Sequence, residues 1–153
     1  PSPLPKITVN LDYSSGAIGR QSYSVMLFDH VFPRYIADAR AFGLAEQVDE
    51  LQNMGLLKGA TLENTVMVDH WKVLNEDGLR YANEFVIHKI LDAIGDIYLL
   101  GHPVIGEFRA YKSGHDLNNK LLRAMLDEQA SWEEISFKDP RKSPISYATP
   151  SYA

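Results

Sequence analysis

Apolar and polar positions alternate along the first part of the chain with the period of a β-strand. Residues 6–13 (KITVNLDY) and 21–27 (QSYSVML) both follow this alternation, and the turn-forming residues Ser14-Ser15-Gly16 lie between them. Two further apolar runs, at residues 64–69 and 104–112, predict two more strands. The pattern therefore predicts a small sheet.

Other segments carry apolar residues at helical spacing. The strongest begins after Asn83, a favourable N-cap residue, and its apolar positions cover a broad side of the helix. Asp29 is a possible cap for an earlier helix, which Gly43 would end. The predicted helices cover residues 29–42, 45–54, 83–97 and 116–132.

The order of these segments indicates the fold class. Strands and helices are mixed along the chain, which is typical of an α+β fold with a sheet packed on helices. A length of 153 residues suits a single compact domain over residues 1–153. Residues 139–153 contain three of the eight prolines and no periodicity, so this tail is predicted to be irregular.

The chain contains no cysteine, and this restricts its chemistry. Disulfides and thiolate metal sites are excluded, so a bound metal would need histidine, aspartate or glutamate ligands. The absence of cysteine also fits a cytoplasmic protein.

Charge and hydropathy exclude two broad classes of function. The net charge of −5 argues against general nucleic-acid binding, which requires a basic surface to neutralise phosphates. No apolar run approaches the ~20 residues of a membrane span. A local basic pocket for one phosphorylated ligand remains compatible with this composition.

Three ionisable residues stack along one side of the predicted helix 83–97. His88, Asp92 and Asp96 are spaced i, i+4 and i+8, so they project from successive turns in the same direction. A histidine and a carboxylate one turn apart can bind one zinc ion together. The alternative is a surface helix on which His88 and Asp92 only pair with each other.

Further candidates are His115, Lys89 and Lys112. His115 lies at the start of the last predicted helix, where a carboxylate partner would suit it to acid–base work. The alternative is a histidine that only helps to begin the helix. Either lysine could bind a phosphate, or could be an ordinary surface lysine.

Two blocks of sequence resemble a known family. Residues 73–96 (VLNEDGLRYANEFVIHKILDAIGD) and 99–121 (LLGHPVIGEFRAYKSGHDLNNKL) closely resemble the second domain of the zinc-dependent UDP-3-O-acyl-N-acetylglucosamine deacetylases of lipid A biosynthesis. The resemblance extends more weakly to ARAFG at residues 39–43 and GRQ at residues 19–21. It covers most of the chain except the extreme N-terminus and the tail.

The resemblance implies a more detailed architecture. In this family two similar α+β domains pack with the active site between them, so this chain would be the second domain without its first. The implied fold is a two-layer sandwich of a small mixed sheet packed on helices. An inserted βαβ-like element, at about residues 40–68, would form a passage for the substrate acyl chain.

Site residues carry over by position in the matching motifs. His88 and Asp92 match two of three zinc ligands. Asp96 matches the carboxylate that orients the catalytic histidine, and His115 matches that histidine, a general acid. Substrate contacts would come from Lys89, Phe42 and Ala41. The residues expected to line the acyl passage, for which plain core packing is the alternative, are Leu44, Val48, Leu57, Leu62 and Met67.

The implied reaction is hydrolysis of the N-acetyl amide of UDP-3-O-acyl-N-acetylglucosamine. Zinc would polarise the carbonyl and lower the pKa of its bound water to ~7. The family's third zinc ligand and its general base come from the first domain, and neither motif is in this chain. We therefore expect little or no activity from the chain alone.

A second departure from the family lies at Ala41. The family usually has threonine there, and its hydroxyl is thought to donate a hydrogen bond to the reacting carbonyl. Ala41 and the missing ligand favour an alternative function, a non-catalytic module that binds an acylated nucleotide sugar or a fatty acyl chain. A generic protein-interaction domain is a third interpretation, against which the two specific blocks argue.

Overall fold

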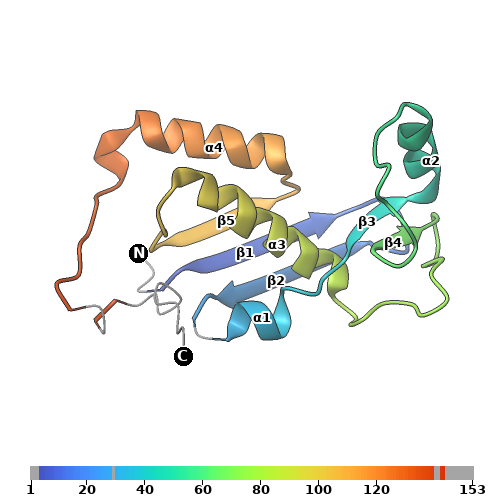
Figure 1. Cartoon of the computed structure of the whole chain (residues 1–153), viewed down its shortest axis with the longest axis horizontal. Helices are drawn as coiled ribbons and strands as arrows, with labels where there is room; N and C mark the ends of the chain where they lie inside the picture. Colours follow the sequence, from blue (N-terminus) through green and yellow to red (C-terminus); the bar gives the residue numbers. More distant parts are fainter. Residues whose placement is uncertain (1–3, 29, 140–141, 144–153) are drawn as a thin grey trace.

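A computed structural model of the chain describes residues 4–28, 30–139 and 142–143. Its main sheet contains β1 (Lys6–Asp12), β2 (Arg20–Met26) and β5 (Glu107–Tyr111), in the order β2-β1-β5 (Figure 1). β1 pairs with β2 in the antiparallel sense and with β5 in the parallel sense, so the sheet is mixed.

Alternation along the central strand explains why one face of the sheet is covered. Ile7, Val9 and Leu11 are buried, while the residues between them are only partly covered. Val9 lies opposite Tyr23 of β2 and Ala110 of β5. An apolar face of this kind requires a second layer to exclude water from it.

Helices form that second layer. α3 (Glu84–Ile97) contacts β1 and β2, and α4 (His115–Asp127) lies beside α3 on the same face of the sheet (Figure 1). The short helix α1 (Val31–Tyr35) follows β2. Two 3₁₀ turns, η1 (Tyr98–Leu100) and η2 (Gln129–Ser131), follow α3 and α4.

The core forms where α3 meets the sheet. Phe85, Val86, Ile90 and Ala93 of α3 are almost completely buried at helical spacing. They belong to the same apolar cluster as the buried residues of β1. The remaining side of α3 is therefore free to carry polar residues.

A second, smaller sheet forms beside the first turns of α3. β3 (Ala41–Leu44) and β4 (Thr65–Val68) pair in parallel, and α2 (Ala45–Asn53) lies in the connection between them (Figure 1). Parallel strands require such a crossover. The βαβ-like element expected at about residues 40–68 is thus confirmed, as is the α+β fold.

Most predicted elements are confirmed within a few residues, but the helix predicted over residues 29–42 is wrong. Its helical part is limited to α1, and Ala41–Leu44 is a strand. The apolar spacing in this segment fits a helix or a strand. Residues 41–44 form a strand because they pair with β4. Asp29, the expected cap, lies outside the described residues. Asn83 precedes α3 as predicted, but its side chain makes no capping hydrogen bond.

Two other expectations concern the ends of elements. The last helix ends at Asp127 and not near Trp132, although the Trp132 indole Nε1 donates to the Met125 carbonyl at 2.9 Å. The tail predicted over residues 139–153 lies mostly outside the described residues. Within the described ranges, no helix combines the length and apolar character needed to cross a bilayer.

Truncation of a buried α3 side chain should lower the stability of the fold substantially. Ile90 is fully buried, so Ile90→Ala removes packed atoms and should lower the free energy of unfolding by about 2–5 kcal/mol in urea denaturation followed by circular dichroism. Leu99→Ala is the matched control, because Leu99 is 70% exposed and should change stability by less than about 0.5 kcal/mol. Equal losses in both variants would contradict this account of the core.

Candidate functional site

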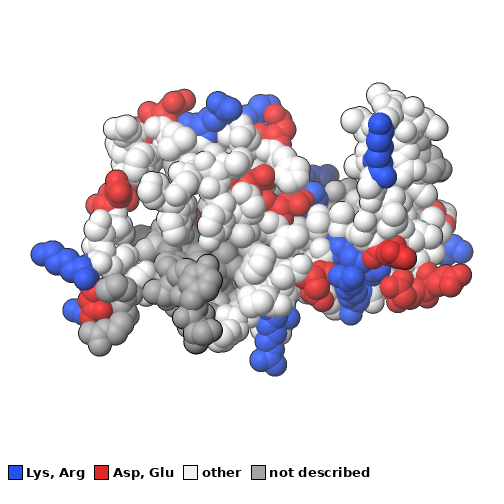
Figure 2. All heavy atoms as spheres, in the orientation of Figure 1, with Lys and Arg blue, Asp and Glu red and all other residues white. Residues whose placement is uncertain are grey.

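The polar side of α3 carries the residues predicted to be functional. His88, Asp92 and Asp96 lie on successive turns, and their side chains are only 13–16% exposed. Figure 2 shows acidic side chains where α3 and α4 approach each other. The structure therefore places these three residues in a partly sheltered row along α3, and the row faces α4 at Asp92 and Asp96.

His88 is held in one orientation by the backbone. Its Nδ1 lies 3.1 Å from the Ala39 carbonyl oxygen, which can only accept, so a neutral His88 carries its proton on Nδ1. Its Nε2 then has a free lone pair, 3.3 Å from Asp92 Oδ1. Two acceptor atoms this close need a shared proton or cation between them, which suits a metal-binding pair.

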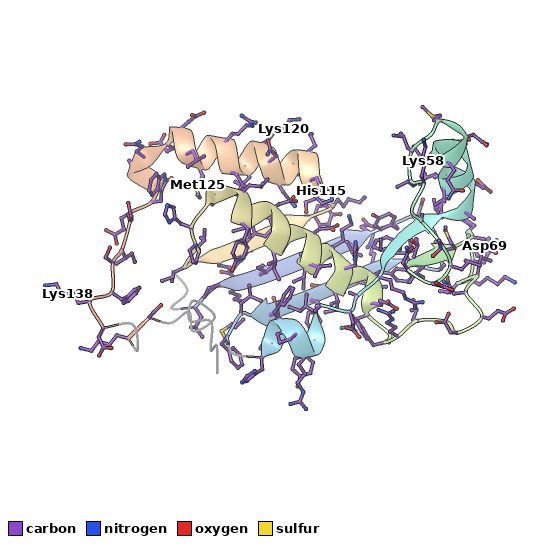
Figure 3. All side chains as sticks on the ribbon, viewed as in Figure 1. Lys58, Asp69, His115, Lys120, Met125 and Lys138 are labelled. Carbon is purple, nitrogen blue, oxygen red and sulfur yellow. The ribbon has the colours of Figure 1, made fainter. Side chains whose placement is uncertain are left out.

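His115 forms a second histidine–carboxylate pair. Its Nδ1 lies 2.9 and 3.0 Å from the two carboxylate oxygens of Asp96, and Asn118 Nδ2 donates to the same carboxylate at 2.7 Å. Figure 3 shows His115 at the first turn of α4. Its Nε2 lies 3.9 Å from Asp92 Oδ1, so the two pairs meet at Asp92.

Lys89 and Phe42 lie beside the first pair. Lys89 Nζ is 2.8 Å from Asp92 Oδ2 and 5.8 Å from the centre of the Phe42 ring. Phe42 also packs edge-on against the His88 ring, at 6.1 Å. The structure thus brings together the predicted metal pair, a lysine and an aromatic residue from β3.

The neighbours of Phe42 along β3 are both small. Ala41 is exposed and its methyl group offers no hydrogen-bond donor. Gly43 has no side chain, and a Cβ added there would come within 2.9 Å of Val48 Cγ2. Gly43 therefore allows α2 to pack closely against β3.

The residues predicted to line an acyl passage differ in exposure. Val48 is buried, whereas Leu57 and Leu62 are about half exposed, at 47% and 58%. Leu44 and Met67 are intermediate. Apolar side chains therefore reach the surface in the loop that follows α2, whereas Val48 of α2 is buried.

A cavity of about 370 Å³ lies elsewhere in the fold. Its lining includes Ile94 and Ile97 of α3, Leu122 of α4, Phe108 of β5 and His102. None of the predicted passage or catalytic residues lines it. The space is lined mostly by apolar side chains and is separate from the histidine–carboxylate row.

A complete metal site is not formed within the described part of the chain. There, no group of three or more histidine, aspartate or glutamate side chains is arranged to hold a metal ion. His88 and Asp92 supply two ligands of suitable chemistry, while His70 stacks on Trp71 and His102 borders the cavity. A third protein ligand would have to come from outside these residues.

The structure contains one buried ionic network that the sequence pattern did not predict. Arg40 Nε donates to Glu84 Oε1 at 2.9 Å and Arg40 Nη2 donates to Glu84 Oε2 at 3.1 Å. The guanidinium also donates to the Gly78 carbonyl at 2.8 Å and to Asp77 Oδ2 at 3.3 Å. Both members of the pair are buried, and they join the segment before β3 to the first residue of α3.

The charge of Glu84 is maintained by its hydrogen bonds. Burial is the largest influence and alone would raise the pKa of the Glu84 carboxyl. Hydrogen bonds from the Arg40 side chain and from the backbone N–H groups of Arg80 and Arg40 lower it further than burial raises it. The pKa of Glu84 therefore lies below its ordinary value of 4.5.

Comparison with known proteins gives one consistent result. A family model described as UDP-3-O-acyl N-acetylglycosamine deacetylase matches residues 1–127. Curated proteins named UDP-3-O-acyl-N-acetylglucosamine deacetylase from Hahella chejuensis and Vibrio parahaemolyticus are 47% and 46% identical, each over 95% of this chain and 49% and 48% of their own length. The protein of that name from Vibrio vulnificus is 50% identical over 82% of this chain and 42% of its own length. The chain spans about half the length of the relatives it matches.

Removal of the Arg40 guanidinium should destabilise the fold in a pH-dependent way. Arg40→Met leaves the buried Glu84 carboxylate without its partner and should cost about 3–5 kcal/mol of unfolding free energy near neutral pH. In the wild type the depressed pKa of Glu84 gives stability that is present above pH 4.5 and is lost as the pH falls through the folded-state pKa. In the variant Glu84 can become protonated and lose its buried charge. The difference in unfolding free energy between wild type and variant should therefore narrow as the pH falls towards 4.5.

The measurement is urea denaturation at a series of pH values. Lys120→Met is the matched control, because it breaks an exposed i,i+4 pair with Asp116 and should cost less than about 0.5 kcal/mol at any pH. A difference between Arg40→Met and wild type that widens in acid would contradict the assignment of a charged Glu84.

Proposed function

The chain belongs to the UDP-3-O-acyl N-acetylglycosamine deacetylase family, and on that basis we propose that it is the second domain of a zinc-dependent hydrolase. The whole enzyme would remove the N-acetyl group of UDP-3-O-acyl-N-acetylglucosamine in lipid A biosynthesis, in the cytoplasm. The observation that carries this proposal is the meeting of two histidine–carboxylate pairs at Asp92. Residues 1–153 would act together as one domain.

His88 and Asp92 are the residues that would hold zinc. The fit rests on the hydrogen bond to the Ala39 carbonyl, which leaves Nε2 as a free ligand atom facing the Asp92 carboxylate. A zinc ion held there would supply a Lewis acid that polarises the amide carbonyl and would lower the pKa of a bound water to ~7.

The first half of the enzyme would complete this site. The described residues supply two ligands, and a catalytic zinc normally has three from the protein. We propose that the missing half supplies a histidine ligand and a glutamate general base. This agrees with relatives that are about twice as long as the chain.

His115 would act as the general acid. Asp96 accepts the hydrogen bond from Nδ1, which fixes the ring and leaves Nε2 to transfer a proton. During collapse of the tetrahedral intermediate, a protonated Nε2 would give its proton to the departing amine nitrogen. Asn118 holds the Asp96 carboxylate in place, so we assign it a supporting role.

Substrate recognition would use the residues around β3 and α2. Lys89 would bind a phosphate of the nucleotide, and Phe42 and Ala41 would contact the sugar. Figure 2 shows few charged side chains on the viewed face of α2 and its following loop. We propose that Leu57 and Leu62 contact the acyl chain there, together with Leu44 and Met67, and that Val48 supports them from below.

An exposed apolar surface supports the proposal of a missing partner. Leu117 and Leu121 lie one turn apart on α4 and are 54% and 49% exposed, and Leu99 near the end of α3 is 70% exposed. Large apolar side chains that are exposed to solvent often mark an interface when they form a patch. We propose that the first half of the enzyme covers this surface.

Zinc should bind weakly to the chain at His88. In a Zn²⁺ titration followed by ¹⁵N NMR, the His88 ring signals should shift, and Asp92→Ala should weaken binding by more than about 10–100-fold because it removes a direct ligand. Asp116→Ala removes the same charge from an exposed position on α4 and should leave the titration unchanged. If the His88 ring signals do not shift on addition of zinc, the result would favour the alternative, a binding module that uses no metal.

The chain alone should show little or no deacetylase activity, and adding the first half in trans should restore it. In the assembled enzyme Ala41→Thr should raise kcat by up to about 10²–10³-fold, because a hydroxyl would then donate to the reacting carbonyl. Ala41→Val, which has a similar shape without the hydroxyl, is the control. Robust turnover by the chain alone, or equal rates for the Thr and Val variants, would contradict these assignments.

A further inference from the structure

One peptide group connects the buried ionic network to the candidate metal pair. The Arg40 backbone N–H donates to Glu84 Oε1 at 3.1 Å. The Ala39 carbonyl, at the other end of the same peptide bond, accepts from His88 Nδ1 at 3.1 Å. Glu84 and His88 are one turn apart on α3, so this peptide group spans two successive turns of the helix.

The geometry of a peptide group makes this connection rigid. The group is planar, and in the trans form its N–H and C=O point in opposite directions. Fixing the N–H on Glu84 therefore aims the carbonyl at His88. Because the Ala39 carbonyl can only accept, its direction decides which ring nitrogen of a neutral His88 carries the proton.

Glu84 is well suited to hold this peptide group. Its side chain is fully buried and both carboxylate oxygens are occupied. Oε1 accepts from the backbone N–H and the side-chain Nε of Arg40, and Oε2 accepts from Arg40 Nη2 and from the Arg80 backbone N–H at 2.7 Å. Four donors from two segments leave the carboxylate one position.

We propose that Glu84 is a positioning residue for the metal site, acting through the Ala39–Arg40 peptide group. It sets the carbonyl that keeps the His88 proton on Nδ1 and directs Nε2 towards Asp92. Arg40 contributes in two ways. Its backbone N–H belongs to the peptide group that Glu84 holds, and its guanidinium neutralises the buried carboxylate. This inference rests on the proposed role of His88 as a zinc ligand.

The test compares Glu84→Gln with wild type in the full chain. Gln has nearly the same shape, but its amide nitrogen is a donor and cannot accept from the groups that face Glu84. The first readout is the ¹⁵N NMR tautomer of His88 without zinc, at a pH well above the ordinary imidazole pKa. The second is Zn²⁺ affinity by titration with the metal alone.

In wild type the neutral His88 should carry its proton on Nδ1. In Glu84→Gln part of the population should move to the Nε2–H tautomer, and Zn²⁺ affinity should fall about 10–100-fold, as for loss of other partners that orient a metal ligand. Ile7→Ala is the control for general destabilisation, since Ile7 is buried in β1 and its apolar side chain cannot take part in these hydrogen bonds. It should lower the melting temperature and leave tautomer and affinity unchanged.

A second variant keeps the inference testable if Glu84→Gln does not fold. Arg40→Met/Glu84→Gln removes both buried charges together, so neither is left unpaired. It should fold and still show the mixed tautomer. Wild-type tautomer and affinity in a folded variant would overturn the proposal. If wild type itself binds no zinc, the proposed metal role fails, while the zinc-free tautomer comparison still decides whether Glu84 positions His88.

Discussion

A carboxylate without access to water places a strong constraint on this fold. Burying the charge of Glu84 would be very costly unless every oxygen lone pair faced a donor, and donors from Arg40 and Arg80 meet that need. Arg80 directly precedes α3, whereas Arg40 lies 44 residues before Glu84 in sequence. Satisfying one buried charge therefore fixes the strand that enters the βαβ element against the helix that carries the candidate site.

Helix α3 contributes both to the hydrophobic core and to the candidate site. One side supplies two of the largest fully buried side chains, Phe85 and Ile90, and the other carries His88, Asp92 and Asp96. The apolar side prevents the helix from rotating or sliding on the sheet, so the polar row keeps its position relative to α4. The proposed acid His115 and the proposed ligand pair can then share Asp92 without flexible loops.

The candidate site has the properties of half of a larger one. The rings of His88 and His115 are each held through Nδ1, and each leaves Nε2 towards Asp92. The two rings are held in this way although the described residues supply only two candidate metal ligands, His88 and Asp92. Such preorganisation would let a second polypeptide segment complete the site by adding ligands, with little rearrangement of this half.

The sequence by itself determined the elements that depend on local pattern. Alternation predicted β1, helical spacing predicted α3, and the i, i+4, i+8 spacing predicted that His88, Asp92 and Asp96 share one side. Only the tertiary structure decided that Ala41–Leu44 is a strand, because its pairing partner lies beyond α2. It alone also joined Glu84 to Arg40 and His88 to the Ala39 carbonyl, contacts 44 and 49 residues apart. Local periodicity reports which side of an element is buried, but it carries no information about which distant donor or acceptor will lie against that side.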